Sequence, residues 1–583
     1  MNRWNLNALY LGFDDPTFLD DFEQVPVKIK SISQWSPIPS DPAGSILSYL
    51  MLQEPLLMML DRLQHFCELT FTADTNHPKA QKFQTRLEEL QADMAIPETR
   101  FHAFIGSLEN REAVLSGSSF LEERHFFLKE LSDTARFLLD TQTEDLIARL
   151  ASTGSSSWEL LHSQITSDLM VDVPFADGVR SLPLAEVRNL ASHPLSEIRE
   201  AAFRAELAAY PQIASQAALA LNSIKGEVLM LGKLRGYESP LQESLIHSRM
   251  KRETLDVMMN CLKEHLPILE SMYLKKAQML GHNEGLPFWD LFAPVGKTDR
   301  TYTIPEAQER IQTCFRAFSP DLADFAGKAF ENSWIDWSAR KGKVGGAFCS
   351  YAHSIEESRI LMNFTGTFDD LTTLAHELGH GYHDDQLHGL PIHSVQYPMP
   401  LAETASIFCE TLLAQELIRT GTPEERLNIL EMRLQMIGQV LTDIYSRYLF
   451  ETAVFEQRET FTLQADELCA LMLDCQEKAY GKALNPNHRH PYMWVCKPHY
   501  YSAGFSFYNF PYAFGLLFAT GLYAIFKEEG AAFVPKYRAL LHQTGCHSIE
   551  DAALLAGIRL DTPEFWNGAF GLLKEEINQF MAL

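Results

Sequence analysis

Most of the chain carries the hydrophobic spacing of amphipathic α-helices. Between Thr254 and Leu280, apolar residues recur every three or four positions, as expected of a helix that buries one face. The same periodicity recurs in Glu123–Thr141, Leu184–Ala208, Leu427–Phe455 and Ile549–Phe580. The pattern therefore predicts a mainly α fold.

Strand-like sequence is confined to a short region before residue 376. Arg359–Phe364 is a β-compatible run, and Lys343–Cys349 is a candidate partner whose glycines would allow a ligand to approach the backbone closely. We therefore expect a small sheet beside the helix that follows.

Composition and charge exclude several classes of protein. The chain has 583 residues, of which 46% are hydrophobic and 21% charged, as in an ordinary globular protein. A net charge of −27, without clustered Lys and Arg, argues against a nucleic-acid partner. No stretch approaches the ~20 apolar residues that cross a bilayer, and the first residues lack the pattern of a secretory signal, so we expect no membrane partner. Nine scattered cysteines without a C-x-x-C pair favour a reducing compartment, and we predict a cytoplasmic location.

The segment that follows Thr367 has the pattern of a metal-binding helix. Thr367 and Asp370 have the spacing of a capping box, which predicts a helix from about Phe368. His376 and His380 project about 40° apart on this helix, so both imidazoles can bind one tetrahedral zinc ion. The apolar residues lie on the opposite side, at Leu371, Leu374, Ala375, Leu378 and Tyr382. Glu377 is turned by about 100° from His376, where it can hold a metal-bound water and act as general base.

A catalytic zinc ion needs a third protein ligand and one open position. Position 386 is Gln, so the histidine extension of the H-E-x-x-H pattern is missing, and a later carboxylate is the other common solution. Glu403 and Glu410 are seven residues apart on the next predicted helix, which can begin at Pro400. We predict Glu403 as the ligand and Glu410 as an acceptor for an imidazole N–H, and the residues alone leave the reverse assignment open.

At these residues the sequence resembles the oligoendopeptidase F branch of the M3, thimet oligopeptidase-like, metallopeptidases. The resemblance spans nearly the whole chain from Trp4–Tyr10 onward and is most specific between residues 340 and 515. Its motifs are Gly345–Cys349, Thr373–Gly381, Ala402–Ser406 with Glu410, His499 and Phe507–Gly515. It implies a two-lobed, clam-shaped helical fold with a deep substrate channel, which would admit short peptides and exclude folded proteins. We place the N-terminal helical lobe at 1–195 and the catalytic domain at 196–583.

The resemblance also concerns the roles of individual residues. It supports Glu403 as the third ligand of one zinc ion per chain and Glu410 as its outer neighbour. It implies that Gly345, Gly346, Ala347 and Phe348 pair with an extended substrate, a form of β-strand addition.

The aromatic segment after residue 498 contains the candidates for transition-state stabilisation. Attack on a peptide carbonyl develops an oxyanion that needs hydrogen-bond donors, and His499, Tyr508 and Tyr512 are candidates for this role. Related enzymes use His and Tyr from the corresponding segment.

The predicted function is therefore zinc-dependent hydrolysis of short peptides, with Glu377 as general base for a metal-activated water. Two alternatives are a catalytically inactive peptide-binding protein that kept the fold and a metal hydrolase of non-peptide amides. The sequence does not specify the oligomeric state or the cleavage preference.

Overall fold

The computed structural model describes residues 3–116, 118–296 and 300–583. These residues form a mainly α-helical protein with two small sheets, which confirms the predicted fold class. They group into two compact units, and each unit is assembled from three separate stretches of chain. The predicted boundary between an N-terminal lobe (1–195) and a catalytic domain (196–583) stays a prediction.

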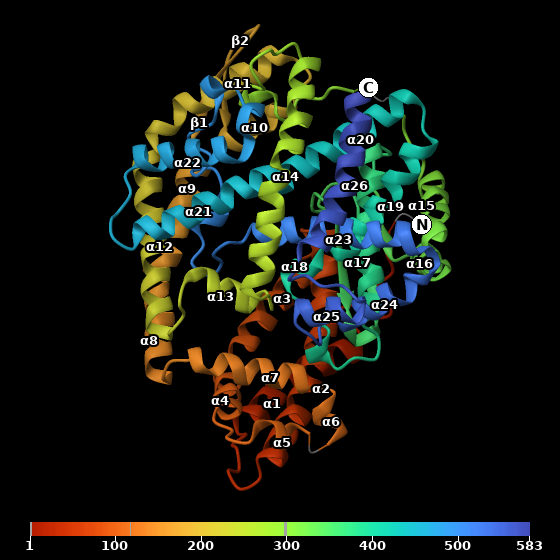
Figure 1. Ribbon diagram of the computed structural model, residues 1–583. Coiled ribbons are helices and arrows are strands. Elements are labelled where there is room, and N and C mark those ends of the chain that lie inside the picture. Colours follow the sequence, from red (N-terminus) through yellow and green to blue (C-terminus); the bar gives the residue numbers. More distant parts are fainter. Residues whose placement is uncertain (1–2, 117, 297–299) are drawn as a thin grey trace. The chain divides into compact units, whose positions relative to one another are not determined.

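Unit 1 comprises Met1–Leu138, Arg300–Glu416 and Ile525–Ile558. Its first stretch supplies most of one hydrophobic core, built from helices α1–α7 (red to orange in Figure 1) and the residues before them, together with Ala352. The helices of the unit are α1 (Pro16–Ser33), α2 (Pro42–Ala73), α3 (Pro78–Ala92), α4 (Ala95–Gly106), α5 (Arg111–Leu115), α6 (Ser119–Glu122), α7 (His125–Thr134), α15 (Ile304–Phe318), α16 (Pro320–Glu331), α17 (Phe368–Asp385), α18 (Met399–Ala402), α19 (Thr404–Thr420), α24 (Val534–Gln543) and α25 (Ile549–Leu555).

Unit 2 comprises Leu139–Asp299, Leu417–Ala524 and Arg559–Leu583. Its core joins residues from Leu169 to Ile224 with residues from Phe450 to Tyr501. The helices of the unit are α8 (Thr141–Ala151), α9 (Ser155–Ser167), α10 (Leu184–Asn189), α11 (Ser196–Ala209), α12 (Ala214–Arg235), α13 (Pro240–His247), α14 (Arg252–Met279), α20 (Pro423–Gly438), α21 (Ile444–Arg458), α22 (Ala465–Tyr480), α23 (Phe510–Glu529) and α26 (Pro563–Ala582). Helices α19 and α23 each continue across a boundary between the units.

The sheet of unit 1 lies beside helix α17, as predicted. Its strands β3 (Ile335–Asp336), β4 (Phe348–Ala352) and β5 (Glu357–Leu361) are in the order β3-β5-β4, and both β4 and β5 pack against α17. Strand β4 pairs with β5 in antiparallel register, with Phe348 opposite Leu361. The pairing is confirmed, but β4 begins later than the predicted run. Gly345 and Gly346 therefore precede the strand, in a turn where Gly346 adopts a φ of +81°.

A second sheet, in unit 2, was not predicted from the sequence. In unit 2, β1 (Met170–Phe175) and β2 (Gly178–Pro183) form an antiparallel hairpin. Its sequence pattern is modest: Val171 and Val173 flank the polar Asp172, and the hairpin turn is formed by Ala176 and Asp177, followed by Gly178. The strands are short, and the surrounding helical periodicity masked this alternation.

Helix ends differ from the predictions where proline or glycine interrupts a periodic segment. The predicted helix Thr254–Leu280 is α14, and Pro267 lies inside it. The segment Leu184–Ala208 is instead divided into α10 and α11, because His193 precedes Pro194 and takes an extended conformation. Ile549–Phe580 is divided in the same way near Gly557, which has a φ of +77°.

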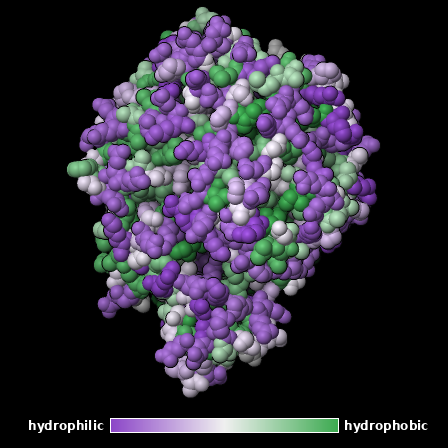
Figure 2. Space-filling model, in the orientation of Figure 1, coloured by the Kyte–Doolittle hydropathy of each residue, from purple (hydrophilic) through white to green (hydrophobic). Residues whose placement is uncertain are grey.

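Two helices are long and apolar enough to cross a membrane by length and composition alone, contrary to our expectation of none. They are Pro42–Ala73 and Phe510–Ala532, and 39% and 67% of their most apolar windows are buried within the protein. Polar residues such as Gln53 and Glu54 interrupt the helix Pro42–Ala73, but the mean hydropathy of 1.3 in its most apolar window is still that of a possible membrane-spanning helix. Core helices of globular proteins meet the same criterion, and the face drawn in Figure 2 is mostly hydrophilic with small scattered apolar groups.

Candidate functional site

Helix α17 begins where its capping box predicts. Thr367 Oγ1 accepts the backbone N–H of Asp370 at 3.1 Å, and the Asp370 carboxylate accepts the backbone N–H of Thr367 at 3.0 Å. The predicted apolar face is buried, at Leu371, Leu374, Ala375, Leu378 and Tyr382. This anchoring fixes the rotation of α17 and directs His376 and His380 to its other side.

Three side chains of unit 1 form a group that can hold a metal ion: His376, His380 and Glu403. The two imidazole Nε2 atoms are 3.1 Å apart, and Glu403 Oε2 lies 3.4 Å from the first and 3.6 Å from the second. A tetrahedral ion with bonds of ~2.0–2.1 Å has donor-to-donor edges of about 3.3 Å. The donor types and their spacing therefore fit zinc.

Glu403 is placed by a break in the helix that the sequence analysis treated as continuous. The short helix α18 ends at Ala402, with Pro400 in its first turn as predicted, and α19 starts at Thr404. Ser406 Oγ donates a hydrogen bond of 2.8 Å to Glu403 Oε2. Ser406 thus orients the carboxylate, a role that its position three residues after Glu403 would have suggested.

Each histidine has a hydrogen-bond acceptor for its second ring nitrogen. Glu410 Oε1 pairs with Nδ1 of His376, as predicted, and the backbone of Ala402 accepts a hydrogen bond from His380. Burial lowers the pKa of His376, but the hydrogen bond and charge of Glu410 outweigh it and raise the pKa to about 9. Burial and the charge of His376 lower the pKa of His380 to about 4. An acceptor at Nδ1 fixes the tautomer that leaves Nε2 free to bind metal.

Glu377 lies beside the metal group without joining it. Its side chain is buried, and burial, reinforced by the charges of Glu403 and Glu410, raises its pKa to about 7 in spite of His376. A hydrogen bond from the backbone N–H of Cys349, in strand β4, lowers the pKa of Glu377 and so partly offsets this increase. A carboxylate with a pKa near neutrality is suited to accept and release a proton.

Gly379 allows the two metal-binding segments to approach closely. A Cβ atom at this position would lie 2.5 Å from the carbonyl oxygen of Ala405 and 2.6 Å from Cα of Ser406. These are backbone atoms next to Glu403, so they cannot move away without shifting the ligand. The glycine between the two histidines thus sets the distance between α17 and α19.

We therefore expect Gly379→Ala to destabilise the protein by about 1–3 kcal/mol and to weaken metal binding. Gly232→Ala is a matched control, because Gly232 also lies in a helix and its added Cβ would meet nothing within 4 Å. Gly232→Ala should leave the stability of the protein unchanged or increase it slightly. Thermal melting and competition with a zinc chelator measure both effects, and wild-type metal affinity in Gly379→Ala would contradict the proposed constraint.

The other histidines near the motif have structural contacts. His383 is buried, with Nε2 2.8 Å from Thr544 Oγ1, and its ring stacks on Tyr397 at 4.1 Å. Asp384 accepts a hydrogen bond of 3.0 Å from the Tyr397 hydroxyl. Tyr397 and Thr544 therefore pack against α17 through these two side chains.

His499, Tyr508 and Tyr512 lie together in unit 2. The rings of His499 and Tyr508 stack at 4.6 Å, and the hydroxyl of Tyr512 donates to that of Tyr508 at 3.1 Å. His499 Nδ1 is buried and has no hydrogen-bond partner in the described part of the chain. The structure thus brings the three candidates together as one polar cluster, in a different unit from the metal group.

Comparison with known proteins defines the class. Residues 189–572, more than half of the chain, match the sequence profile of peptidase family M3. The chain is 23% identical to an oligoendopeptidase F homolog of Lactococcus lactis over 93% of this chain and 91% of that protein. It is also 23% identical to oligopeptidase PepF of Bacillus subtilis, over 100% and 87% of the respective chains.

Solved structures share the fold. A structure from Chlamydophila abortus, assigned as a peptidase, has a TM-score of 0.88 at 21% identity and covers 100% of this chain and 98% of its own. Oligoendopeptidase-F from Enterococcus faecium has a TM-score of 0.72 at 18% identity, with coverage of 97% and 98%. The fold is therefore that of a mainly α peptidase.

The fold and the His-His-Glu group together define a metallopeptidase. The chain belongs to peptidase family M3, and it is a metalloendopeptidase.

Proposed function

We propose that the chain is a zinc-dependent endopeptidase that cleaves short peptides, with Glu377 as the general base. The observation that carries the proposal is the group formed by His376, His380 and Glu403, whose donor separations of 3.1, 3.4 and 3.6 Å match a tetrahedral zinc site. Two imidazoles and one carboxylate are also a donor set that zinc uses in hydrolytic enzymes.

Zinc held by these donors supplies Lewis acidity, which makes a water more acidic and polarises a peptide carbonyl. Glu377 then accepts the proton of the attacking water on its carboxylate and delivers it to the nitrogen of the leaving amine. Its burial favours this cycle, because the raised pKa lets the carboxylate hold the proton between the two steps. Glu410 and the Ala402 carbonyl keep both imidazoles oriented throughout.

Two features support a peptide substrate. Within the described residues, strand β4 pairs with β5 alone. The backbone N–H of Cys349 is bound to Glu377, but the rest of the other edge of β4 and the preceding Gly345–Ala347 segment can pair with an extended peptide backbone. No atom lies within 4 Å of a Cβ built at Gly345 or Gly346. The names of the bacterial relatives, oligoendopeptidase and oligopeptidase, support a short substrate.

We retain His499, Tyr508 and Tyr512 as candidate donors to the oxyanion, on the family resemblance, the hydrogen bond from Tyr512 to Tyr508 and the stacking of His499 on Tyr508. A cytoplasmic location remains part of the proposal, because all nine cysteines are free thiols.

The test combines metal removal with a series of substrates. Treatment with a zinc chelator should abolish cleavage of an internally quenched peptide, and one equivalent of Zn²⁺ per chain should restore it. Short peptides should be cleaved at internal bonds, and a folded protein should resist cleavage under the same conditions. Cleavage that survives complete metal removal would contradict the zinc dependence, and equal cleavage of the folded protein would contradict the size selection.

A further inference from the structure

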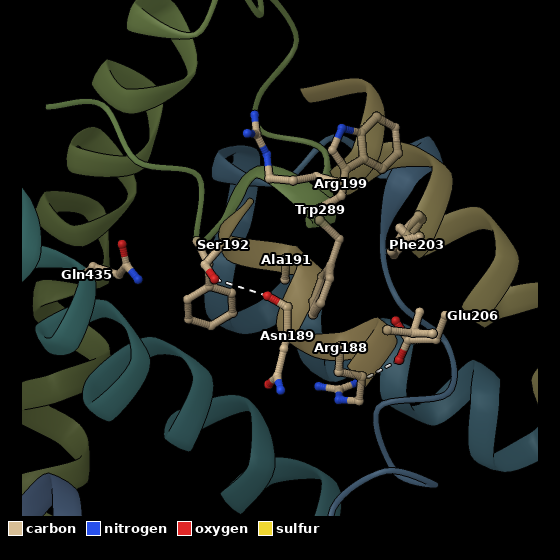
Figure 3. A pocket seen from close by; sticks show the side chains of 13 residues that line it. Arg188, Asn189, Ala191, Ser192, Arg199, Phe203, Glu206, Trp289 and Gln435 are labelled. Carbon is tan, nitrogen blue, oxygen red and sulfur yellow. Dashed lines mark hydrogen bonds and ion pairs between the residues drawn. The ribbon is translucent and has the colours of Figure 1, made fainter. Parts of the chain in front are cut away.

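Unit 2 contains a cavity of about 230 Å³ that is separate from every residue assigned a role above (Figure 3). Helices α10 and α11, the turn between them and the turn at Phe288–Asp290 supply most of its lining. Arg199, Phe203, Glu206 and Trp289 form a buried floor, whereas Asn189 and Ser192 form an exposed rim. A buried floor below an open rim is the form of a small-molecule site.

Aromatic rings form one side of the cavity. The ring of Phe203 lies 5.2 Å from that of Trp289 at an angle of 53°, and 6.0 Å from that of Phe288 at 25°. Phe292 completes the group. Such surfaces favour a flat apolar body, because ring faces and edges attract an aromatic guest beyond simple burial.

A fixed ion pair lies beside these rings. Arg188 Nη1 donates to Glu206 Oε1 at 2.6 Å, and the same oxygen accepts the Tyr210 hydroxyl at 2.7 Å and lies 3.3 Å from His490 Nε2. Burial raises the pKa of Glu206, but His490 and Arg188 outweigh it and lower the pKa to about 2. Glu206 thus holds Arg188, Tyr210 and His490 together through one carboxylate oxygen.

Arg188 keeps hydrogen-bonding capacity for a ligand. Its side chain is 28% exposed, and besides Glu206 its partners are the hydroxyl of Tyr210 and, through Nη2, the sulfur of Met493 at 3.9 Å, a weak acceptor. Charges of both signs lie nearby: burial and Arg447 are the main causes of the lowered pKa of Lys497, and Asp443 opposes them. The remaining donors of Arg188 favour an anionic partner.

We propose that this cavity binds a carboxylate carried on an apolar, preferably aromatic, body, such as the C-terminal residue of a peptide or an N-acylated amino acid. Arg188 receives the carboxylate, since guanidinium groups match its planar geometry. The apolar body packs against Phe203 and Trp289. The volume is below the ~300–1,000 Å³ of sites for drug-sized ligands, so it suits a single residue.

Calorimetric titration of the metal-loaded full chain tests the ligand class without any measurement of peptide cleavage. N-acetyl-L-phenylalanine should bind at least tenfold more tightly than N-acetyl-L-phenylalanine amide, which lacks the negative charge. L-phenylalanine amide, which carries a positive charge, should bind least. Equal binding of the acid and its neutral amide, tighter binding of the cation, or no binding of the acid would each overturn the proposal.

Two variants locate the site. Arg188→Met combined with Glu206→Gln removes both charges together, and it should reduce the affinity for the acid at least tenfold, to that of the amide. Ala191→Phe fills the cavity from its wall and should abolish binding of both ligands. Arg235→Met is the matched control, because Arg235 is also partly exposed and also paired with a glutamate, Glu144, elsewhere in unit 2.

The control should bind the acid as the wild type does. Thermal melting establishes that each variant is folded. If the double variant fails to fold, Ala191→Phe decides the question, and unchanged binding in that variant would overturn the assignment of the site.

Discussion

Replacing Glu377 with glutamine should lower kcat by about 10²-fold or more while metal and peptide affinity stay near those of the wild type. The amide has almost the same shape as the carboxylate but cannot accept the proton of the attacking water. Because Glu377 is not among the three donors that surround the metal position, its replacement leaves the zinc site complete. Cleavage of a quenched peptide gives kcat, and metal analysis of the purified variant gives its zinc content.

The matched control for this variant is Glu331→Gln, an exposed glutamate at the end of helix α16 of the same unit. It undergoes the same chemical change away from the metal group and should keep the kcat of the wild type. A Glu377→Gln enzyme with near-normal turnover would remove Glu377 from the mechanism.

The second large effect concerns the third ligand. Glu403→Ala should lose tightly bound zinc, and with it nearly all activity, because two imidazoles alone leave the ion with an incomplete protein shell. Glu410→Ala should retain zinc with an affinity reduced about 10–100-fold, since Glu410 touches only the far nitrogen of His376. Zinc affinity measured by chelator competition separates the two variants.

The comparison also tests the alternative assignment that the sequence left open. Full zinc retention in Glu403→Ala, together with loss of zinc in Glu410→Ala, would exchange the two roles. Ser406→Ala should reduce the zinc affinity less than Glu403→Ala does, because it removes the hydrogen bond to Glu403 and leaves every metal donor in place.

The metal helix could be predicted from the sequence because its determinants are local. The capping box at Thr367, the apolar stripe and the spacing of the two histidines all lie within one helix. In a helix, the spacing of two residues determines the directions in which their side chains project. The role of Glu410 was not determined by such local geometry: the residues alone left it interchangeable with that of Glu403, and the family resemblance supported the choice.

Features that depend on contacts distant in sequence were not predictable in the same way. The break between α18 and α19 at Glu403 has no proline or glycine to announce it, and the close approach at Gly379 requires knowledge of which backbone lies opposite. The cavity at Arg188 joins residues from 187 to 435, and no local pattern brings these positions together. The hairpin β1–β2 was missed because its alternation is shorter than the periodic segments around it.

The division of unit 1 into three stretches has a consequence for synthesis on the ribosome. All three metal donors emerge within residues 376–403, yet the packing behind them is supplied much later: Thr544 contacts His383, and Tyr537 stacks on Phe408 at 4.6 Å. Helix α17 therefore leaves the exit tunnel before the surfaces that cover its back exist. At ~5–20 residues per second, about 150 further residues keep those apolar surfaces uncovered for roughly 8–30 s. The nascent chain is thus a natural client for chaperones over this interval, and the metal centre acquires its final rigidity only when the last part of the unit has been synthesised.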